Sequence, residues 1–216
     1  MRRAPTEEDR ENQNARRRRV WDKKAPGYDK EIGWFERHVL GLDNRSWACA
    51  RAQGQVLEVA VGTGLNIPLY HPDVRLSAID LSSGMLEIAR QRVAALVRPV
   101  NLCQADAHEL PFADEAFDSV VCTFSLCNIP DIARAVAEMY RVLKPGGRLV
   151  LVDHIRSANI LVYAIQKAIE FLSVRIDGDH MTRRPLDQVR AQGFEILEDE
   201  RYRLGGIIER LVARKS

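Results

Sequence analysis

Residues 56–66 read Val-Leu-Glu-Val-Ala-Val-Gly-Thr-Gly-Leu-Asn, and this stretch decides the fold of the chain. A run of apolar, β-favouring residues that breaks at two glycines is typical of a buried parallel strand turning into a helix at the ligand end of a doubly wound α/β sheet. Because Gly62 and Gly64 have no Cβ, the backbone there turns tightly and a ligand can lie against it. The N–H groups of the following helix would then face an anionic group. Glu58 is unusual inside a strand, because a buried carboxylate usually needs a cationic partner.

Two kinds of nucleotide turn compete for this stretch. A dinucleotide site requires G-x-G-x-x-G, in which the third glycine allows close packing of helix on strand. Ile67 occupies that third position, so the dinucleotide pattern fails and a dehydrogenase is disfavoured. The other pattern is acidic-x-G-x-G-x-G, which the stretch from Glu58 matches except that Ala60 stands in the first glycine slot. Since alanine is the smallest residue with a Cβ, this departure affects only how closely the backbone approaches a ligand.

The composition limits the classes of protein to which the chain belongs. Its 216 residues with 46% hydrophobic content suit one domain with a substantial core, and a net charge of +2 gives no global attraction for nucleic acid. We find no stretch long and apolar enough to span a bilayer, and no secretory signal. The cysteines lack C-x-x-C spacing and the histidines lack an H-E-x-x-H pair. We therefore expect no metal site, and reduced thiols in a cytoplasmic protein.

The N-terminal segment is polar and highly charged, and it cannot bury enough apolar area to order itself. We therefore predict a disordered tail over residues 1–19 and a single domain over residues 20–216. The arginine run at residues 16–19 is expected to be a solvated face, with a peripheral contact to an anionic membrane as the alternative. Aromatic residues over 21–35 mark an ordered segment that packs on the domain, interrupted at Pro26-Gly27.

Acidic residues mark three successive predicted strands. Glu58 lies inside the first strand, Asp80 ends residues 75–80, and Asp106 follows residues 100–105. Asp80 comes about 20 residues after Glu58, the offset at which a nucleotide fold places the carboxylate that accepts hydrogen bonds from a ribose. A lone aspartate after a strand is usually a turn former. Three such acids in succession favour a nucleotide site.

The second half of the chain continues the alternating α/β pattern. We expect a strand and its exit over 117–128, helices over 132–143 and 185–192, a strand over 147–153 and a hairpin over 194–213. Residues 160–172 are apolar almost all round, so a helix there must be buried or meet a ligand, a partner or a membrane surface. We expect residues 155–184 to form a lid and substrate-pocket wall above the ligand end of the sheet, with a dimer interface as the alternative.

Several motifs together resemble those of class I S-adenosylmethionine-dependent methyltransferases. They are E-V-A-V-G-T-G, A-I-D-L-S-S-G-M-L, A-D-A-H-E-L-P-F, F-D-S-V-V and L-K-P-G-G-R-L, and the resemblance covers about residues 20 to 213. The D-L-S-S-G-M-L and L-P-F segments are similar to ubiquinone and menaquinone C-methyltransferases. The segments V-C-T-F-S-L-C, Asp153-His154 and 177–183 are similar to thiol S-methyltransferases and bacterial phospholipid amine methyltransferases.

The resemblance implies a fold, a cofactor and a set of site residues. The fold is a doubly wound, Rossmann-like sheet of seven strands, mostly parallel with an antiparallel C-terminal strand. The cofactor is S-adenosyl-L-methionine, with Asp106 accepting from the adenine amino group and Asp80 from the ribose. The residues expected to bind it are Tyr28, Glu58, Ala60, Gly62, Gly64, Asn66, Asp80, Leu81, Met85, Asp106, Ala107, Thr123 and Leu126.

The expected activity is methyl transfer to a small apolar or amphipathic acceptor, which the sequence leaves open as a thiol, amine, phenol or quinol. Asp153 and His154 are the candidate catalytic base, because they leave the fifth strand beside the methyl site and an imidazole titrates near neutrality. A structural, hydrogen-bonding His154 is the alternative.

Three other functions are alternatives to the methylation of a small acceptor. They are phospholipid amine methylation at a membrane surface, a catalytically silent protein that binds the cofactor, and nucleic-acid methylation. The last is disfavoured because residues 123–126 read T-F-S-L, whereas base methylation uses [DNS]-P-P-[YFW]. The partners expected are therefore a small-molecule acceptor and no nucleic acid, for a monomer or homodimer.

Overall fold

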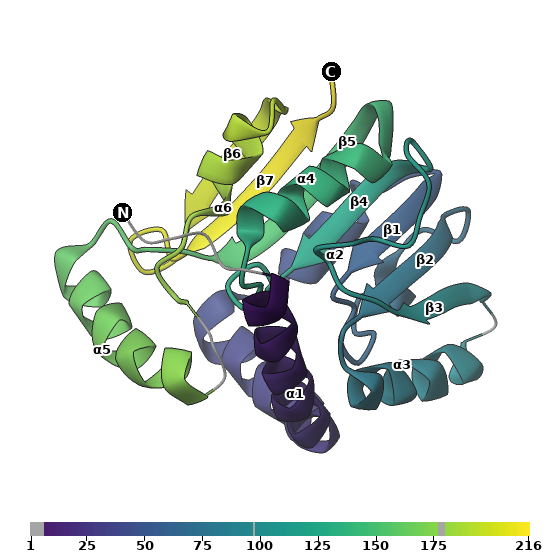
Figure 1. The fold of residues 1–216 in the computed structure, drawn as a ribbon. Helices are drawn as coiled ribbons and strands as arrows, with labels where there is room; N and C mark the ends of the chain where they lie inside the picture. The colour runs from purple at the N-terminus through teal and green to yellow at the C-terminus, as the bar shows by residue number, and fades with distance from the viewer. Residues whose placement is uncertain (1–6, 97, 177–179) are drawn as a thin grey trace.

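The centre of the molecule is a seven-stranded sheet with the order β3-β2-β1-β4-β5-β7-β6 (Figure 1). The structure is a computed structural model that describes residues 7–96, 98–176 and 180–216. Strands β1 to β5 pair in parallel, and β7 runs antiparallel to both β5 and β6. This confirms the doubly wound sheet with an antiparallel C-terminal strand. The strands are β1 (Gln55–Val59), β2 (Arg75–Asp80), β3 (Val100–Gln104), β4 (Phe117–Thr123), β5 (Leu143–His154), β6 (Glu195–Tyr202) and β7 (Ile208–Arg214).

Both faces of the sheet are buried, which explains why the central strands are almost continuously apolar. Alternate residues of β4 and β5 point to opposite faces, so Val120 joins one core cluster and Val121 the other. Helices α4 (Ile132–Val142) and α6 (Pro185–Ala191) cover the first face. Helices α2 (Asn44–Cys49) and α3 (Ser83–Ala95) cover the second.

The N-terminal helix α1 (Glu7–Phe35) differs from the tail expected over residues 1–19 and from the break expected at Pro26-Gly27. The described part of that tail, from Glu7, is helical, and the helix continues through Pro26 into the short π-helix η1 (Glu36–Leu40). Polar contacts hold α1 on both sides of the proline. The Asp22 carboxylate accepts from Ser82 Oγ at 2.6 Å, and Asp29 pairs with Arg92 at 2.5 Å. Tertiary contacts therefore outweigh the local preference of Pro and of the charged run.

The segment after β1 also departs from the sequence-based expectation. The glycine turn leads into one turn of 3₁₀ helix, η2 (Ile67–Leu69), rather than into a long helix whose N-terminus could face an anion. The neighbouring β1 and β4 start the two halves of the sheet that wind in opposite directions, and their carboxyl ends form the switch point where ligands bind in this architecture. Helix α1 lies across this end of the sheet (Figure 1).

Helix α5 (Ile160–Ile176) occupies most of the segment expected to be a lid, 155–184, and stands to one side of the sheet at the left of Figure 1. Within the described part of this segment, none of the residues lines either of the cavities described below. The lid role therefore stays a prediction. Among the described residues, no helix has both the length and the apolar character needed to cross a bilayer.

Candidate functional site

A cavity with about 740 Å³ of space free of protein atoms, its open mouth included, lies between α1 and the carboxyl ends of β1 to β4. It is formed by the strand exits below and by α1 above, which contributes Trp21 and Tyr28. Burial raises the pKa of the Tyr28 hydroxyl to about 12, so this side chain stays uncharged. The residues expected to bind the cofactor that line this cavity are Tyr28, Ala60, Gly62, Asp80, Leu81, Met85, Asp106 and Ala107.

The glycine turn has two distinct jobs. Gly62, with φ 57°, faces the cavity, and a Cβ placed there would meet only the Tyr28 ring, 4.0 Å away. Gly64, with φ 82°, faces the protein, because a Cβ there would lie 2.7 Å from Ile67 Cδ1. Ala60 adopts φ 58° in the first glycine slot of the pattern, a left-handed conformation that costs an L-residue about 1–2 kcal/mol. The backbone therefore keeps the turn despite the substitution.

Asp80 links the ends of β1 and β2. Its two carboxylate oxygens accept from Gly62 N and from Ser82 N, both at 2.8 Å. Burial nevertheless raises the pKa of Asp80 to about 6, with Asp22 adding negative charge nearby. A carboxylate that is buried, oriented by two N–H groups and open to the cavity is suited to accept hydrogen bonds from hydroxyl groups.

Asp106 lies at the opposite end of the cavity, after β3. One of its oxygens accepts from His108 N at 2.9 Å, and the other accepts from the side-chain amide of Asn14. Partial burial acts against ionisation, but the hydrogen bonds from His108 hold the pKa of Asp106 below its usual range. An ionised Asp106 is therefore available as an acceptor at neutral pH.

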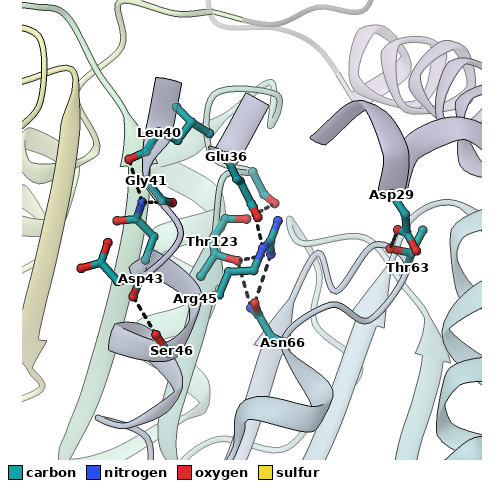
Figure 2. Close-up of polar contacts among 12 residues, drawn as sticks. Asp29, Glu36, Leu40, Gly41, Asp43, Arg45, Ser46, Thr63, Asn66 and Thr123 are labelled. Carbon is teal, nitrogen blue, oxygen red and sulfur yellow. Dashed lines mark hydrogen bonds and ion pairs between the residues drawn. The ribbon is translucent and has the colours of Figure 1, made fainter. Parts of the chain in front are cut away.

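Arg45 contacts Glu36, Asn66 and Thr123 (Figure 2), and Asn66 connects this group to the buried carboxylate of Glu58 beneath the cavity. Asn66 Nδ2 donates to Glu58 Oε1 at 2.9 Å, while Arg45 donates to Asn66 Oδ1 at 3.1 Å and to Thr123 Oγ1 at 3.4 Å. Burial raises the pKa of Glu58 to about 7, and Tyr70, the charge of Arg45 and the bond from Asn66 offset this only in part. Arg45 is the cation of this network, but it pairs directly with Glu36 at 2.6 Å and reaches Glu58 only through Asn66.

Several predicted site residues therefore do not line the cavity. Glu58, Asn66 and Thr123 form the buried network beneath it, Gly64 packs against Ile67, and Leu126 is buried in the core at 1% exposure. Asn66 connects β1 to β4, because its Nδ2 donates to both Glu58 Oε1 and Thr123 Oγ1.

Two lining residues from α1 were missed in the sequence. Asn14 reaches Asp106, and Arg17 Nε donates to Asn128 O at 2.6 Å. Nothing local marks them, because single polar residues in a charged run carry no positional signal. Trp21, which also lines the cavity, is the one residue here that the sequence marks, because an aromatic side chain predicts packing against the domain.

A second cavity adjoins the first and shares a wall with it. Trp21, Tyr28, Phe124 and Asn128 line both cavities. Beyond this wall, the side chains that line the second cavity are largely apolar, and a few polar groups lie among these side chains. Its other lining residues are Lys24, Glu31, Ile32, Phe35, Leu40, Cys127 and His154.

The predicted catalytic pair lies at this second cavity. The Asp153 carboxylate is buried at 3% exposure and accepts from His154 N at 2.8 Å and from Cys127 N at 3.3 Å. Its Oδ1 lies 4.0 Å from His154 Nδ1, which is longer than a hydrogen bond. Asp153 therefore acts on the His154 ring through its charge. Cys127 joins them, with one ligand-type atom of each residue lying within 4.8 Å of the others. The spacing in the sequence did not indicate this cluster.

Comparison with known proteins gives the chain a family. A family model described as a methyltransferase domain matches residues 57–151. Over 181 residues the chain is 36% identical to a demethylmenaquinone methyltransferase of Thermus thermophilus, covering 76% of this chain and 80% of the relative. Over 118 residues it is 45% identical to a phosphatidylethanolamine N-methyltransferase of Cereibacter sphaeroides, covering 54% of this chain.

Coverage and fold differ among these comparisons. The chain spans 58% of the length of the Cereibacter sphaeroides relative, which is less than two thirds. Among solved structures, a methyltransferase of Thermotoga maritima that depends on S-adenosylmethionine superposes with a TM-score of 0.69 at 23% identity. The superposition covers 92% of this chain and 99% of that one, and at this identity it shows a shared fold.

Proposed function

This chain belongs to the S-adenosylmethionine-dependent methyltransferases, and we propose that its two adjoining cavities hold the cofactor and an apolar or amphipathic methyl acceptor. The observation that carries the proposal is the wall shared by Trp21, Tyr28, Phe124 and Asn128. Two ligands that occupy adjoining cavities come into contact where the side chains of the shared wall leave an opening. Such an arrangement suits direct transfer of a group from one ligand to the other.

The residues of the first cavity fit the cofactor. Gly62 leaves open space against the backbone, and Asp80 presents a buried carboxylate suited to two ribose hydroxyls. Asp106 offers an acceptor for an exocyclic amino group at the other end. The cavity lies at the switch point of the sheet, where this architecture binds nucleotides. We therefore assign ribose recognition to Asp80 and adenine recognition to Asp106.

The second cavity supports an acceptor that is partly apolar and carries one polar reacting group. Its aromatic side chains Trp21, Tyr28, Phe35 and Phe124 suit a hydrophobic body, while His154 and Cys127 stand where a polar end would lie. The two relatives named above act, by their names, on demethylmenaquinone and on phosphatidylethanolamine, both of which have this division. A quinol or a lipid amine is thus the acceptor class that we favour.

The chain's own residues do three things in the reaction that we propose. When bound, S-adenosylmethionine supplies a methyl group that is already activated for transfer. The shared aromatic wall orients the acceptor and excludes water, which is worth up to about 7–11 kcal/mol of barrier in well-oriented reactions. His154 accepts the proton that the acceptor loses, typically a further ~10²–10⁴-fold in rate. The buried negative charge of Asp153, 4.0 Å from the ring, stabilises the imidazolium that results.

A screen of acceptors with methyl-labelled cofactor tests the proposed function. The full chain is incubated with thiols, quinols and phospholipid amines in detergent, and label in each product is counted. We expect transfer to quinols or phospholipid amines and weak transfer to small hydrophilic thiols. Cofactor binding measured by calorimetry, together with no transfer to any class, would instead identify a silent cofactor-binding protein.

A further inference from the structure

Helix α5 has its apolar and polar sides reversed relative to an ordinary surface helix. Six of its large apolar side chains are strongly exposed: Ile160 (73%), Leu161 (72%), Ile165 (61%), Ile169 (47%), Phe171 (62%) and Leu172 (58%). Its polar residues Gln166 and Glu170 are buried instead, at 6% and 7% exposure. Soluble proteins rarely expose so many large apolar side chains together, and such a patch marks an interaction surface.

The orientation of α5 is fixed by its polar side. Gln166 donates to Ile155 O and accepts from Ser157 N, both at 2.8 Å, which ties the middle of the helix to the segment that leaves β5. Glu170, one turn further on, accepts from Thr182 Oγ1 at 2.7 Å and lies 3.5 Å from His180 Nδ1. Because both polar anchors lie on one face of the helix, four residues apart, the apolar residues on the opposite face must point away from the protein.

The charges at this surface are positive. The sequence of α5 contains a single acid, Glu170, which is buried and pairs with the half-exposed Lys167 at 3.1 Å, so this pair adds no net charge to the surface. Just before the helix, Arg156 is exposed and lies over the Tyr163 ring at 4.3 Å. The turn beside the helix start adds exposed Arg203 and Leu204, and the neighbouring Gly205 O accepts from Ala158 N at 2.8 Å. An apolar face bordered by cations is the composition that binds anionic lipid headgroups.

We infer that the exposed face of α5, with the 203–204 turn and Arg156, is a docking surface for an anionic lipid bilayer. The helix lies in the interface with its apolar side chains among the acyl chains and its cations at the phosphates. A second copy of the chain fits less well, because protein interfaces are depleted of lysine relative to the rest of the surface, and Lys167 stands half exposed at the border of this face. The sequence analysis gave a membrane contact at residues 16–19 only as the alternative to a solvated face, and Arg17 in this run lines the first cavity.

The position of the surface relates it to the site. His154 ends β5 at the second cavity, and α5 begins at Ile160 after a short connection. A bilayer held against α5 would therefore lie next to the cavity that we assign to an amphipathic acceptor. Docking rests on this surface and not on either cavity, so it stands or falls independently of the acceptor and of methyl transfer.

Vesicle co-sedimentation of the full chain tests the inference. The probes are vesicles of phosphatidylcholine with and without phosphatidylglycerol, at low and high salt. We expect binding to the anionic vesicles that weakens with salt. Ile165→Asp should lower the fraction bound at least tenfold. The matched control is Leu197→Asp, an exposed apolar residue on β6 (42%), which should leave binding unchanged.

Two further measurements separate this outcome from its rivals. Leu161→Asp repeats the test at a second exposed position, and thermal melting checks that each variant is folded. Equal vesicle binding by the wild type and both α5 variants would overturn the inference. Light scattering that shows a dimer dissociated by Ile165→Asp, without vesicle binding by the wild type, would assign the surface to a second copy instead.

Discussion

The side-chain amide of Asn14 donates a hydrogen bond to the carboxylate of Asp106, a residue 92 positions further along the chain. One partner lies in a charged N-terminal run, and the other lies at the exit of β3 in the cavity that we assign to the cofactor. This bond, with that from Arg17 to Asn128, makes the beginning of α1 part of the cavity wall.

Replacing Asn14 tests whether this contact holds the wall in place. We expect Asn14→Ala to speed cofactor release and to weaken binding by about 1 kcal/mol, roughly five-fold, the contribution of one hydrogen bond. Calorimetry and stopped-flow release measure the two effects. Asn12→Ala, an exposed position on the same helix, is the control and should bind normally. Tighter binding by Asn14→Ala would show instead that the amide competes with the adenine.

Asp80 should make cofactor binding depend on pH. Its pKa is raised to about 6, and hydroxyl donors from a ribose favour the ionised form. Below that pKa a proton must leave before the ligand binds, so affinity should rise as pH increases to about 6 and level off above it. Asp80→Asn should give a flat profile and weaken binding at neutral pH by roughly 1–3 kcal/mol.

Calorimetric titration across this pH range measures the profile. The matched control is Asp73→Asn, whose side chain is 90% exposed in a loop. An Asp80→Asn variant that keeps the wild-type pH dependence would remove Asp80 from the ribose site.

Glu58 should make the stability of the free protein fall as pH rises. Burial raises its pKa from 4.5 to about 7, so the folded state holds a proton more tightly than the unfolded state does. The free energy of unfolding then decreases from about pH 5 to about pH 7, by an amount on the order of 3 kcal/mol. Glu58→Gln, which stays neutral, should remove that slope.

Urea unfolding at several pH values provides the measurement for Glu58. The comparison is the difference between wild type and Glu58→Gln, because other groups contribute the same slope to both. If the two proteins lose stability in parallel, Glu58 is ionised at every pH tested and Arg45 compensates it fully.

His154 should control the rate of methyl transfer without affecting cofactor affinity. As the proton acceptor it should give a rate that rises with pH and reaches a plateau once the ring is neutral. His154→Ala should reduce turnover by roughly 10²-fold or more, and least for acceptors that are already deprotonated. The pH–rate profiles of both proteins on two acceptors of different pKa measure this.

A structural His154 would produce a different pattern. Turnover on both acceptors would then fall by the same factor, thermal stability would fall with it, and the shape of the pH profile would not change. His71→Ala, at an exposed loop position, controls for the loss of an imidazole elsewhere.

The fold and much of the cofactor site could be predicted because their signals are local. The apolar run before Gly62 can only be a strand buried on both faces, and the acids that follow strand ends must meet at one edge of a parallel sheet. Asp80, Asp106 and the glycine turn accordingly line one cavity. The predictions that differ from the structure concern segments held by contacts with distant parts of the chain. Residues 7–19 are held in place by hydrogen bonds such as that from Asn14 to Asp106, which no local sequence pattern encodes.

The sequence by itself determined the alternation of strands and helices and the chemistry placed at the strand ends, because periodicity and chain direction dictate them. Only the tertiary structure decided how that chemistry is used. It showed that Arg45 reaches Glu58 through Asn66, that Cys127 joins Asp153 and His154, and that α5 turns its apolar face outward. The physical reason is that side-chain direction depends on which polar groups find partners across the fold. In α5, Gln166 and Glu170 found theirs inside, and the apolar residues were left facing out.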